Sequence, residues 1–137
     1  MFHFSVFLSA LAGCAGTVDL SQTAWQGDLQ SSPGGLSGSV AAVSSSYTET
    51  SIQISRALAG ESYFWRINAG DCQNEGGIVG GTAVYPKLVP GESGVAGAEA
   101  ALSQPLHDGG AYAARVVQQR PDGGEIRIAC GVLRQIR

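Results

Sequence analysis

Few side chains in this sequence could carry out acid–base or metal chemistry. The chain contains two histidines, His3 and His107, and the first of them lies within the opening residues. His107 stands beside Asp108 in residues 106–110, where two glycines predict a turn. A histidine beside a carboxylate can act as a general base, but neighbours in sequence rarely have the geometry that this needs. No serine or cysteine nucleophile is indicated, so we expect His107 to be a turn residue.

The first of the three cysteines, Cys14, follows a segment typical of exported bacterial proteins. Phe4–Ala12 is an apolar run too short to span a bilayer, and it leads into Leu-Ala-Gly-Cys. This ending resembles the bacterial lipobox, whose cysteine is lipidated before the leader is removed. We therefore expect residues 1–13 to be a signal peptide and Cys14 to carry a lipid anchor, although the leader has no lysine or arginine. An ordinary secretory signal and a mature N-terminus are the alternatives.

The lipid anchor implies a location in the cell envelope. Ala15 follows Cys14, and an aspartate there would be the usual signal for retention in an inner membrane. In a bacterium with two membranes, alanine favours the outer membrane. The membrane is then a partner of the chain through its lipid, and each buried methylene adds roughly 0.8 kcal/mol.

The other two cysteines, Cys72 and Cys130, are expected to form a disulfide. Once Cys14 is lipidated they are the two that remain, and paired cysteines are common in exported chains. Their bond would close a loop of about 59 residues, for which the chain-entropy model gives roughly 4 kcal/mol. Two buried free thiols are the alternative.

Composition excludes several classes of function. The net charge is −3, charged residues make up 14% of the chain, and no run of like charges or cluster of basic and aromatic residues occurs. Nucleic acid and anionic lipid headgroups are therefore not expected partners. The glycine pairs at 76–77 and 80–81 do not precede a helix, so they do not predict a phosphate-binding loop.

The pattern along the chain predicts short strands joined by Gly/Pro turns. Apolar and polar residues alternate most clearly over 49–58, and 70–91 is expected to be a long irregular loop. We expect residues 14–35 to be a linker with a possible edge strand at 22–31, and 36–137 to be one β domain. Further strands are expected over 36–44, 62–68, 93–102, 112–119 and 125–133.

On the last of these strands, 125–133, Ile126, Ile128, Cys130 and Val132 are expected to share the core face. The pattern favours an all-β antiparallel sandwich or flattened barrel.

Two segments resemble the copper–zinc superoxide dismutase family. Residues 65–72, Trp-Arg-Ile-Asn-Ala-Gly-Asp-Cys, are similar to the Trp-His-x-His-x-Gly-x-Cys segment of its small secreted members. Residues 129–132, Ala-Cys-Gly-Val, resemble the last strand of the enzymes. Arg127 stands three residues before that cysteine, where the family has an arginine that helps to attract the anion. The resemblance covers about residues 36–135 and implies an antiparallel Greek-key β-sandwich of the superoxide dismutase-like type.

The chain departs from this family at the metal ligands. The resemblance implies copper and zinc held by a cluster of six histidines and an aspartate, but Arg66 and Asn68 occupy two of the copper-ligand positions. Arginine stays protonated and has no lone pair for a metal. A later copper histidine should follow Tyr112, yet residues 113–119 contain none. His107 alone cannot hold a redox-active copper, so we expect neither metal.

The remaining polar residues allow two interpretations. Arg66 and Asn68 lie two residues apart and share one strand face. Together with Arg115 and Arg127 they could form a small-anion or peptide pocket in the place of the metal. The favoured interpretation of Arg66 and Asn68 is a surface pair, or an arginine that is salt-bridged to a nearby carboxylate. Arg115 could join Arg66, but a solvated position on the outer face is favoured.

Three functions remain. The first is a non-catalytic, lipid-anchored envelope protein with a degenerate superoxide dismutase-like domain and a structural or binding role. The second is a metal-dependent superoxide dismutase, or a related metal-binding protein, with copper and zinc held by unusual ligands. The third is a module that binds a small ligand or a peptide through Arg66, Asn68, Arg115 and Arg127.

Overall fold

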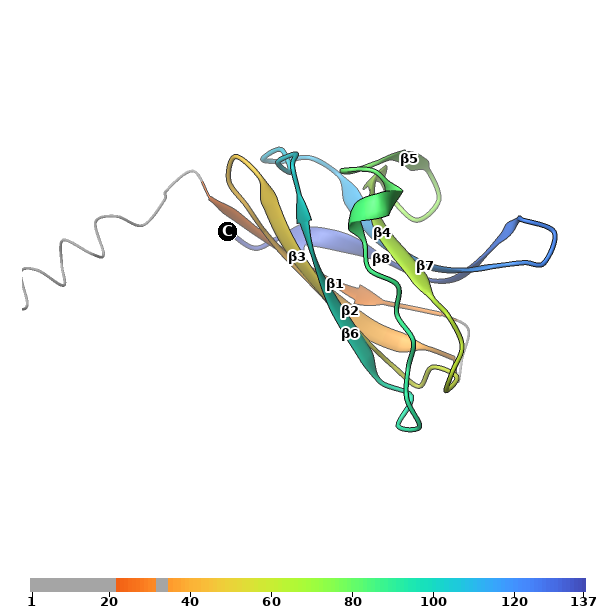
Figure 1. Cartoon of the computed structure of the whole chain (residues 1–137). Coiled ribbons are helices and arrows are strands. Elements are labelled where there is room, and N and C mark those ends of the chain that lie inside the picture. The colour runs from red at the N-terminus through yellow and green to blue at the C-terminus, as the bar shows by residue number, and fades with distance from the viewer. Residues whose placement is uncertain (1–21, 32–34) are drawn as a thin grey trace, which may run out of the picture.

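The computed structural model describes residues 22–31 and 35–137, which form one curled antiparallel sheet (Figure 1). Its order is β5-β4-β7-β8-β1-β2-β3-β6. The strands are β1 (Thr23–Leu29), β2 (Ser37–Ser44), β3 (Thr48–Ser55), β4 (Phe64–Gly70), β5 (Glu75–Ile78), β6 (Ala96–Leu102), β7 (Tyr112–Gln119) and β8 (Glu125–Gln135). A single 3-10 turn, η1 (Thr82–Val84), follows β5. Within these ranges no helix has the length and apolar character needed to cross a bilayer. The predicted all-β antiparallel class is confirmed.

The sheet curls because its longest strand, β8, belongs to both halves. Residues from Glu125 to Leu133 pair with β7, and Arg134 and Gln135 pair with β1. At the crossing the backbones of β1 and β8 come close together: a Cβ on Gly131 would lie 2.3 Å from the Asp28 carbonyl oxygen. Only glycine allows this approach, so Gly131 permits β8 to lie this close to β1.

Period-two alternation places the core inside the curl. In β2 and β3, Val40, Ala42, Ile52 and Ile54 are buried, while Ala41 and Gln53 between them face outward. From the other half, Trp65 and Ile67 of β4 join the same core. The alternation that the sequence predicts over 49–58 is therefore confirmed as far as Ser55, where β3 ends.

Several elements differ from the sequence expectation. The possible edge strand at 22–31 is β1, which lies between β8 and β2 and is therefore not an edge of the sheet. The segment 70–91, expected to be irregular, contains β5 and η1. The strand expected over 49–58 ends at Ser55, because Arg56 has a φ of 56° and turns the chain.

The predicted core face of β8 is wrong. Ile126 and Val132 are exposed, whereas Ala129 and Leu133 belong to the core. The register shifts between the pairs Val116–Ala129 and Val117–Arg127, which leaves Ile128 unpaired in the ladder. Such a bulge interrupts the alternation, so Cys130 lies on the opposite face from the core.

Candidate functional site

Strands β4 and β7 are buried on both faces, and the charged residues lie on the face away from the core. Trp65 and Ile67 point into the core, while Arg66 and Asn68 alternate with them. Arg66 is 8% exposed and Asn68 is 0% exposed. The neighbouring Arg115 of β7 is 1% exposed. Burial of three such polar side chains requires partners that replace water.

Two glutamates provide the charged partners. Arg66 and Arg115 stand directly opposite each other in the β4–β7 ladder, where like charges repel. Glu75 bridges them, with one oxygen 3.3 Å from Nη2 of Arg66 and the other 3.3 Å from Nε of Arg115. Glu125 accepts two hydrogen bonds from Arg66, one from Nη1 at 2.9 Å and one from Nη2 at 2.8 Å. We call Arg66, Glu75, Arg115 and Glu125 the outer-face ion cluster.

The cluster changes the proton affinities of its members. The hydrogen bond from Arg66 lowers the pKa of Glu125, and the hydrogen bond to Glu125 raises the pKa of Arg66. Burial lowers the pKa of Arg115, and the charge of Glu75 opposes that change. The guanidinium of Arg115 is the member whose charge is least well compensated.

Acid is therefore expected to destabilise the protein through Glu125. Because its pKa is lower in the folded chain, its stabilising effect is complete above the pKa of the unfolded chain and is lost as the pH falls through the folded value. Glu125→Gln should reduce the decline in unfolding free energy between about pH 5 and pH 3. Urea unfolding at stepped pH measures this, with Glu61→Gln as a control at an exposed turn. An unchanged pH profile for Glu125→Gln would contradict the assignment.

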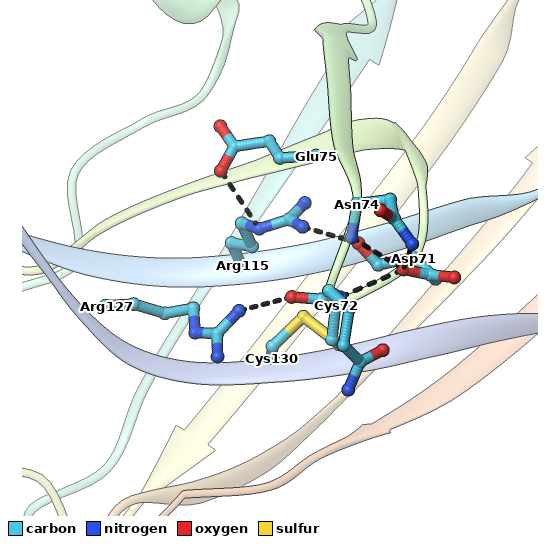
Figure 2. The surroundings of a disulfide bond; sticks show 8 residues. Asp71, Cys72, Asn74, Glu75, Arg115, Arg127 and Cys130 are labelled. Carbon is cyan, nitrogen blue, oxygen red and sulfur yellow. Dashed lines mark hydrogen bonds and ion pairs between the residues drawn. A yellow bond between two sulfur atoms is a disulfide. The ribbon is translucent and has the colours of Figure 1, made fainter.

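The loop of residues 71–74 between β4 and β5, here called the disulfide loop, covers Arg115 from outside. Cys72 is bonded to Cys130, whose ladder partner is Arg115, so the predicted disulfide is present. Figure 2 shows Arg115 between Glu75 and the carbonyl of Asp71, to which its Nη2 donates over 2.5 Å. Arg127 donates to the carbonyl of Cys72. The loop therefore supplies backbone oxygens to two guanidinium groups.

The sequence of the loop explains its tight turn. Gly70 has a φ of 100°, and a Cβ there would lie 2.1 Å from the carbonyl oxygen of Asn74. Oδ1 of Asp71 accepts hydrogen bonds from the backbone N–H groups of Gln73 and Asn74, at 2.9 and 2.7 Å. These bonds lower the pKa of Asp71. The turn returns the chain into β5, which places Glu75 over β4 and β7.

Some buried polar atoms remain without a hydrogen bond among the described residues. Nδ2 of Asn68 donates to the carbonyl of Gly76 at 3.0 Å, but its Oδ1 has no donor. Nε of Arg66 and Nη1 of Arg115 also lack acceptors, and Nε of Arg115 contacts Glu75 without hydrogen-bond geometry. The cluster is thus incompletely satisfied, which costs stability.

The structure brings together three of the residues that the sequence singled out. Arg66, Asn68 and Arg115 lie side by side, and the salt-bridged interpretation of Arg66 is confirmed. The solvated position favoured for Arg115 is wrong, because the disulfide loop covers it. Arg127 is exposed at the rim of the loop.

Sequence reasoning missed both glutamates. Glu75 lies in a segment predicted to be irregular, and Glu125 is 59 residues from Arg66 in sequence. No local pattern connects such distant residues.

Copper and zinc do not fit the residues of the cluster. In the described ranges no group of three or more His, Cys, Asp or Glu side chains is placed to hold a metal ion. The guanidinium groups of Arg66 and Arg115 carry no lone pair and would repel a cation. Cys72 and Cys130 are engaged with each other, and His107 lies in an exposed turn between β6 and β7.

The surface hollow beside the disulfide does not reach the outer-face ion cluster. A surface hollow of about 590 Å³ is bordered by Gln30, Gln73, Arg127 and Arg134 and by both disulfide cysteines. Arg66, Asn68 and Arg115 are not among its lining residues. A ligand in this hollow could contact Arg127 but not the two buried arginines.

Comparison with protein-family models and with curated proteins found no match to this chain.

Proposed function

We propose that this chain is a non-catalytic, lipid-anchored envelope protein built on a degenerate copper–zinc superoxide dismutase-like domain. Its role is structural or binding. The observation that carries the proposal is the environment of Arg66, which stands where the family resemblance places a copper ligand. Instead of a metal ligand, this position carries a buried guanidinium held by Glu125 and Glu75.

The strand connections support the superoxide dismutase-like assignment. The pairs β3–β6 and β4–β7 join strands that are three apart in sequence, so the chain crosses over instead of forming a simple meander. Such crossovers are typical of Greek-key arrangements. The link between Cys72 and Cys130 also joins the two segments that carry the family resemblance.

Charge balance explains how a domain of this type can do without a metal. The outer-face ion cluster contains two arginines and two glutamates, whose formal charges sum to zero. An added divalent cation would displace at least one guanidinium from its carboxylate and would leave it buried without a counterion. That change costs several kcal/mol, on the order of the effective penalty for burying one ion.

Metal analysis tests the proposal. Oxidised protein, incubated with copper and zinc and then dialysed, is expected to retain far less than one metal ion per chain and to lack dismutase activity. The measurement is elemental analysis by mass spectrometry, paired with a superoxide assay. An Arg66→His/Asn68→His variant is the matched comparison, because it restores imidazole donors on the same strand. Stoichiometric copper in the parent protein, together with dismutase activity, would replace the proposal by the enzymatic alternative.

A ligand pocket at the former metal position has less support. Arg66, Asn68 and Arg115 are already surrounded by the two glutamates and the disulfide loop. The neighbouring hollow reaches only Arg127. A small anion would have to displace Glu75 to contact the buried guanidinium groups.

The proposed location depends on Cys14, which lies outside the described residues together with the rest of 1–21. The disulfide supports export, since such bonds form mainly in oxidising compartments. Intact mass of the membrane fraction from a bacterial host tests the anchor. A diacylglyceryl mass increase that disappears in Cys14→Ser would support it, and an unmodified mature chain would contradict it.

A further inference from the structure

The sheet ends at β6 in an unpaired edge. β6 pairs with β3 along all seven residues, in an uninterrupted register from Ala96–Ile54 to Leu102–Thr48. It is the last strand in the sheet order, and Figure 1 shows it at that border. Across the described ranges, no backbone hydrogen bond outside this ladder involves residues 96–102. The outer row of N–H and C=O groups on β6 therefore has no backbone partner in the described ranges, and Gly80 and η1 lie beside it only at the Leu102 end.

This edge has few of the features that usually prevent association. Proteins protect edge strands with charged residues, proline, bulges, short length or a covering loop, and of these β6 has one charged residue, Glu99, and the neighbouring η1 at its Leu102 end. β6 reads Ala-Gly-Ala-Glu-Ala-Ala-Leu, with no lysine or proline and no break in register. The opposite edge, β5, has only four residues and a register shift against β4.

Burial along β6 shows which part of the edge is open. Of its inward-facing residues, Ala100 and Leu102 are buried, whereas Ala96 and Ala98 are only half-buried. The half-buried alanines leave apolar surface beside the edge. An added strand could cover this surface with small or apolar side chains.

The outward face beside this edge is acidic. Glu99 of β6 stands opposite Ser51, and Glu49 of β3 stands opposite Ala101. Asp28 of β1 lies on the same face, and strands β1, β2, β3 and β6 contain no lysine or arginine. The basic residues nearest to this face are Arg56, which directly follows β3, and Arg134, which faces Gln26 at the β1–β8 border.

Small side chains give this acidic face a groove that leads to the edge. A hollow of about 560 Å³ lies between Tyr47, Glu49 and Glu99, over Ala41 and Ala101. The hydroxyl of Tyr47 donates to Glu49 at 2.8 Å, which holds that carboxylate at the border of the hollow. Long basic side chains can lay their methylene stems on such a floor and reach both carboxylates.

We propose that β6 docks an extended segment of a partner protein by strand addition, with alternating basic residues facing Glu99 and Glu49. Backbone hydrogen bonds from Ala96–Leu102 provide the pairing, and the carboxylates select the partner. A second copy of this chain is a poorer occupant, because two antiparallel β6 edges would bring their Glu99 side chains close together. The proposal extends the non-catalytic role but does not depend on metal content, so either can fail without the other.

A synthetic peptide of alternating lysine and valine, acetylated and amidated, tests the proposal with the oxidised domain. Amide NMR signals of residues 96–102 are expected to shift on titration and to become protected from hydrogen exchange. Glu99→Lys should weaken binding about tenfold, equivalent to about 1.4 kcal/mol. Glu61→Lys, the same charge change at an exposed turn, should leave the affinity within about twofold. A glutamate–valine peptide should not bind.

Other results would overturn the proposal. Absence of binding at millimolar peptide, or binding that Glu99→Lys leaves unchanged, would remove the acidic edge as the docking site. Shifts confined to β5 or to the disulfide loop would place the peptide elsewhere. Sedimentation that reveals a dimer of the parent chain, dissociated by the peptide, would instead assign the edge to a second copy.

Discussion

A chain in which Cys72 and Cys130 are both replaced by serine is expected to lose about 4 kcal/mol of unfolding free energy. The bond joins residues 58 positions apart, and the chain-entropy cost of leaving so long a loop open in the unfolded state gives this magnitude. A small domain has about 5–15 kcal/mol in total, so the loss is a large part of its stability. Urea unfolding of the oxidised parent and the double variant measures it.

The disulfide variant should also change the environment of Arg115. The bond holds the loop whose Asp71 carbonyl accepts from Arg115 and whose Cys72 carbonyl accepts from Arg127. Without it, exchange of the amides in 71–75 should become faster than exchange in β2 and β3. Reduction of the parent with dithiothreitol is the control and should reproduce both effects. Equal stability of the reduced and oxidised parent would contradict the expected contribution of the bond.

Replacing Glu75 by glutamine is expected to destabilise the oxidised domain by about 2 kcal/mol. Glu75 is the carboxylate that lies between the opposed guanidinium groups of Arg66 and Arg115. Arg66 keeps Glu125, but Arg115 would be left buried with the Asp71 carbonyl alone. Removing one partner of a buried pair costs about 3–5 kcal/mol, and we reduce that figure because the Glu75 side chain is 47% exposed.

A double variant separates the loss of the ion pair from a general effect of changing Glu75. Arg115→Met combined with Glu75→Gln removes the unpaired charge, so it should recover most of the stability lost in Glu75→Gln. Glu61→Gln, at an exposed turn, should change the unfolding free energy by less than about 0.5 kcal/mol. If Glu75→Gln were no more destabilising than Glu61→Gln, the bridging role of Glu75 would be wrong.

The sequence predicts some of the contacts behind these expectations and not others. The alternation in β3 and the bounds of β7 follow from local patterns, and the predicted strand over 112–119 agrees with Tyr112–Gln119. Pairing of Cys72 with Cys130 followed from cysteine count and compartment. Such features need only neighbouring residues or a short list of possible partners.

Other features needed the complete sheet. The bulge at Ile128 depends on how β8 bends from β7 to β1, so alternation alone placed Cys130 on the wrong face. The central position of β1 depends on its pairing with β2 on one side and with β8 on the other. Neither feature has a signature in a short window of sequence.

The sequence by itself determined an all-β chain, predicted its disulfide and singled out Arg66 and Asn68 as neighbours on one strand face. The tertiary structure decided that these residues are buried, that Arg115 joins them, and that Glu75 and Glu125 balance their charge. The physical reason is that strand alternation assigns a side chain to a face but does not say what covers that face. Here the cover comes from a turn that begins at Gly70 and from a strand that begins at Glu125, and only the folded chain brings both to Arg66.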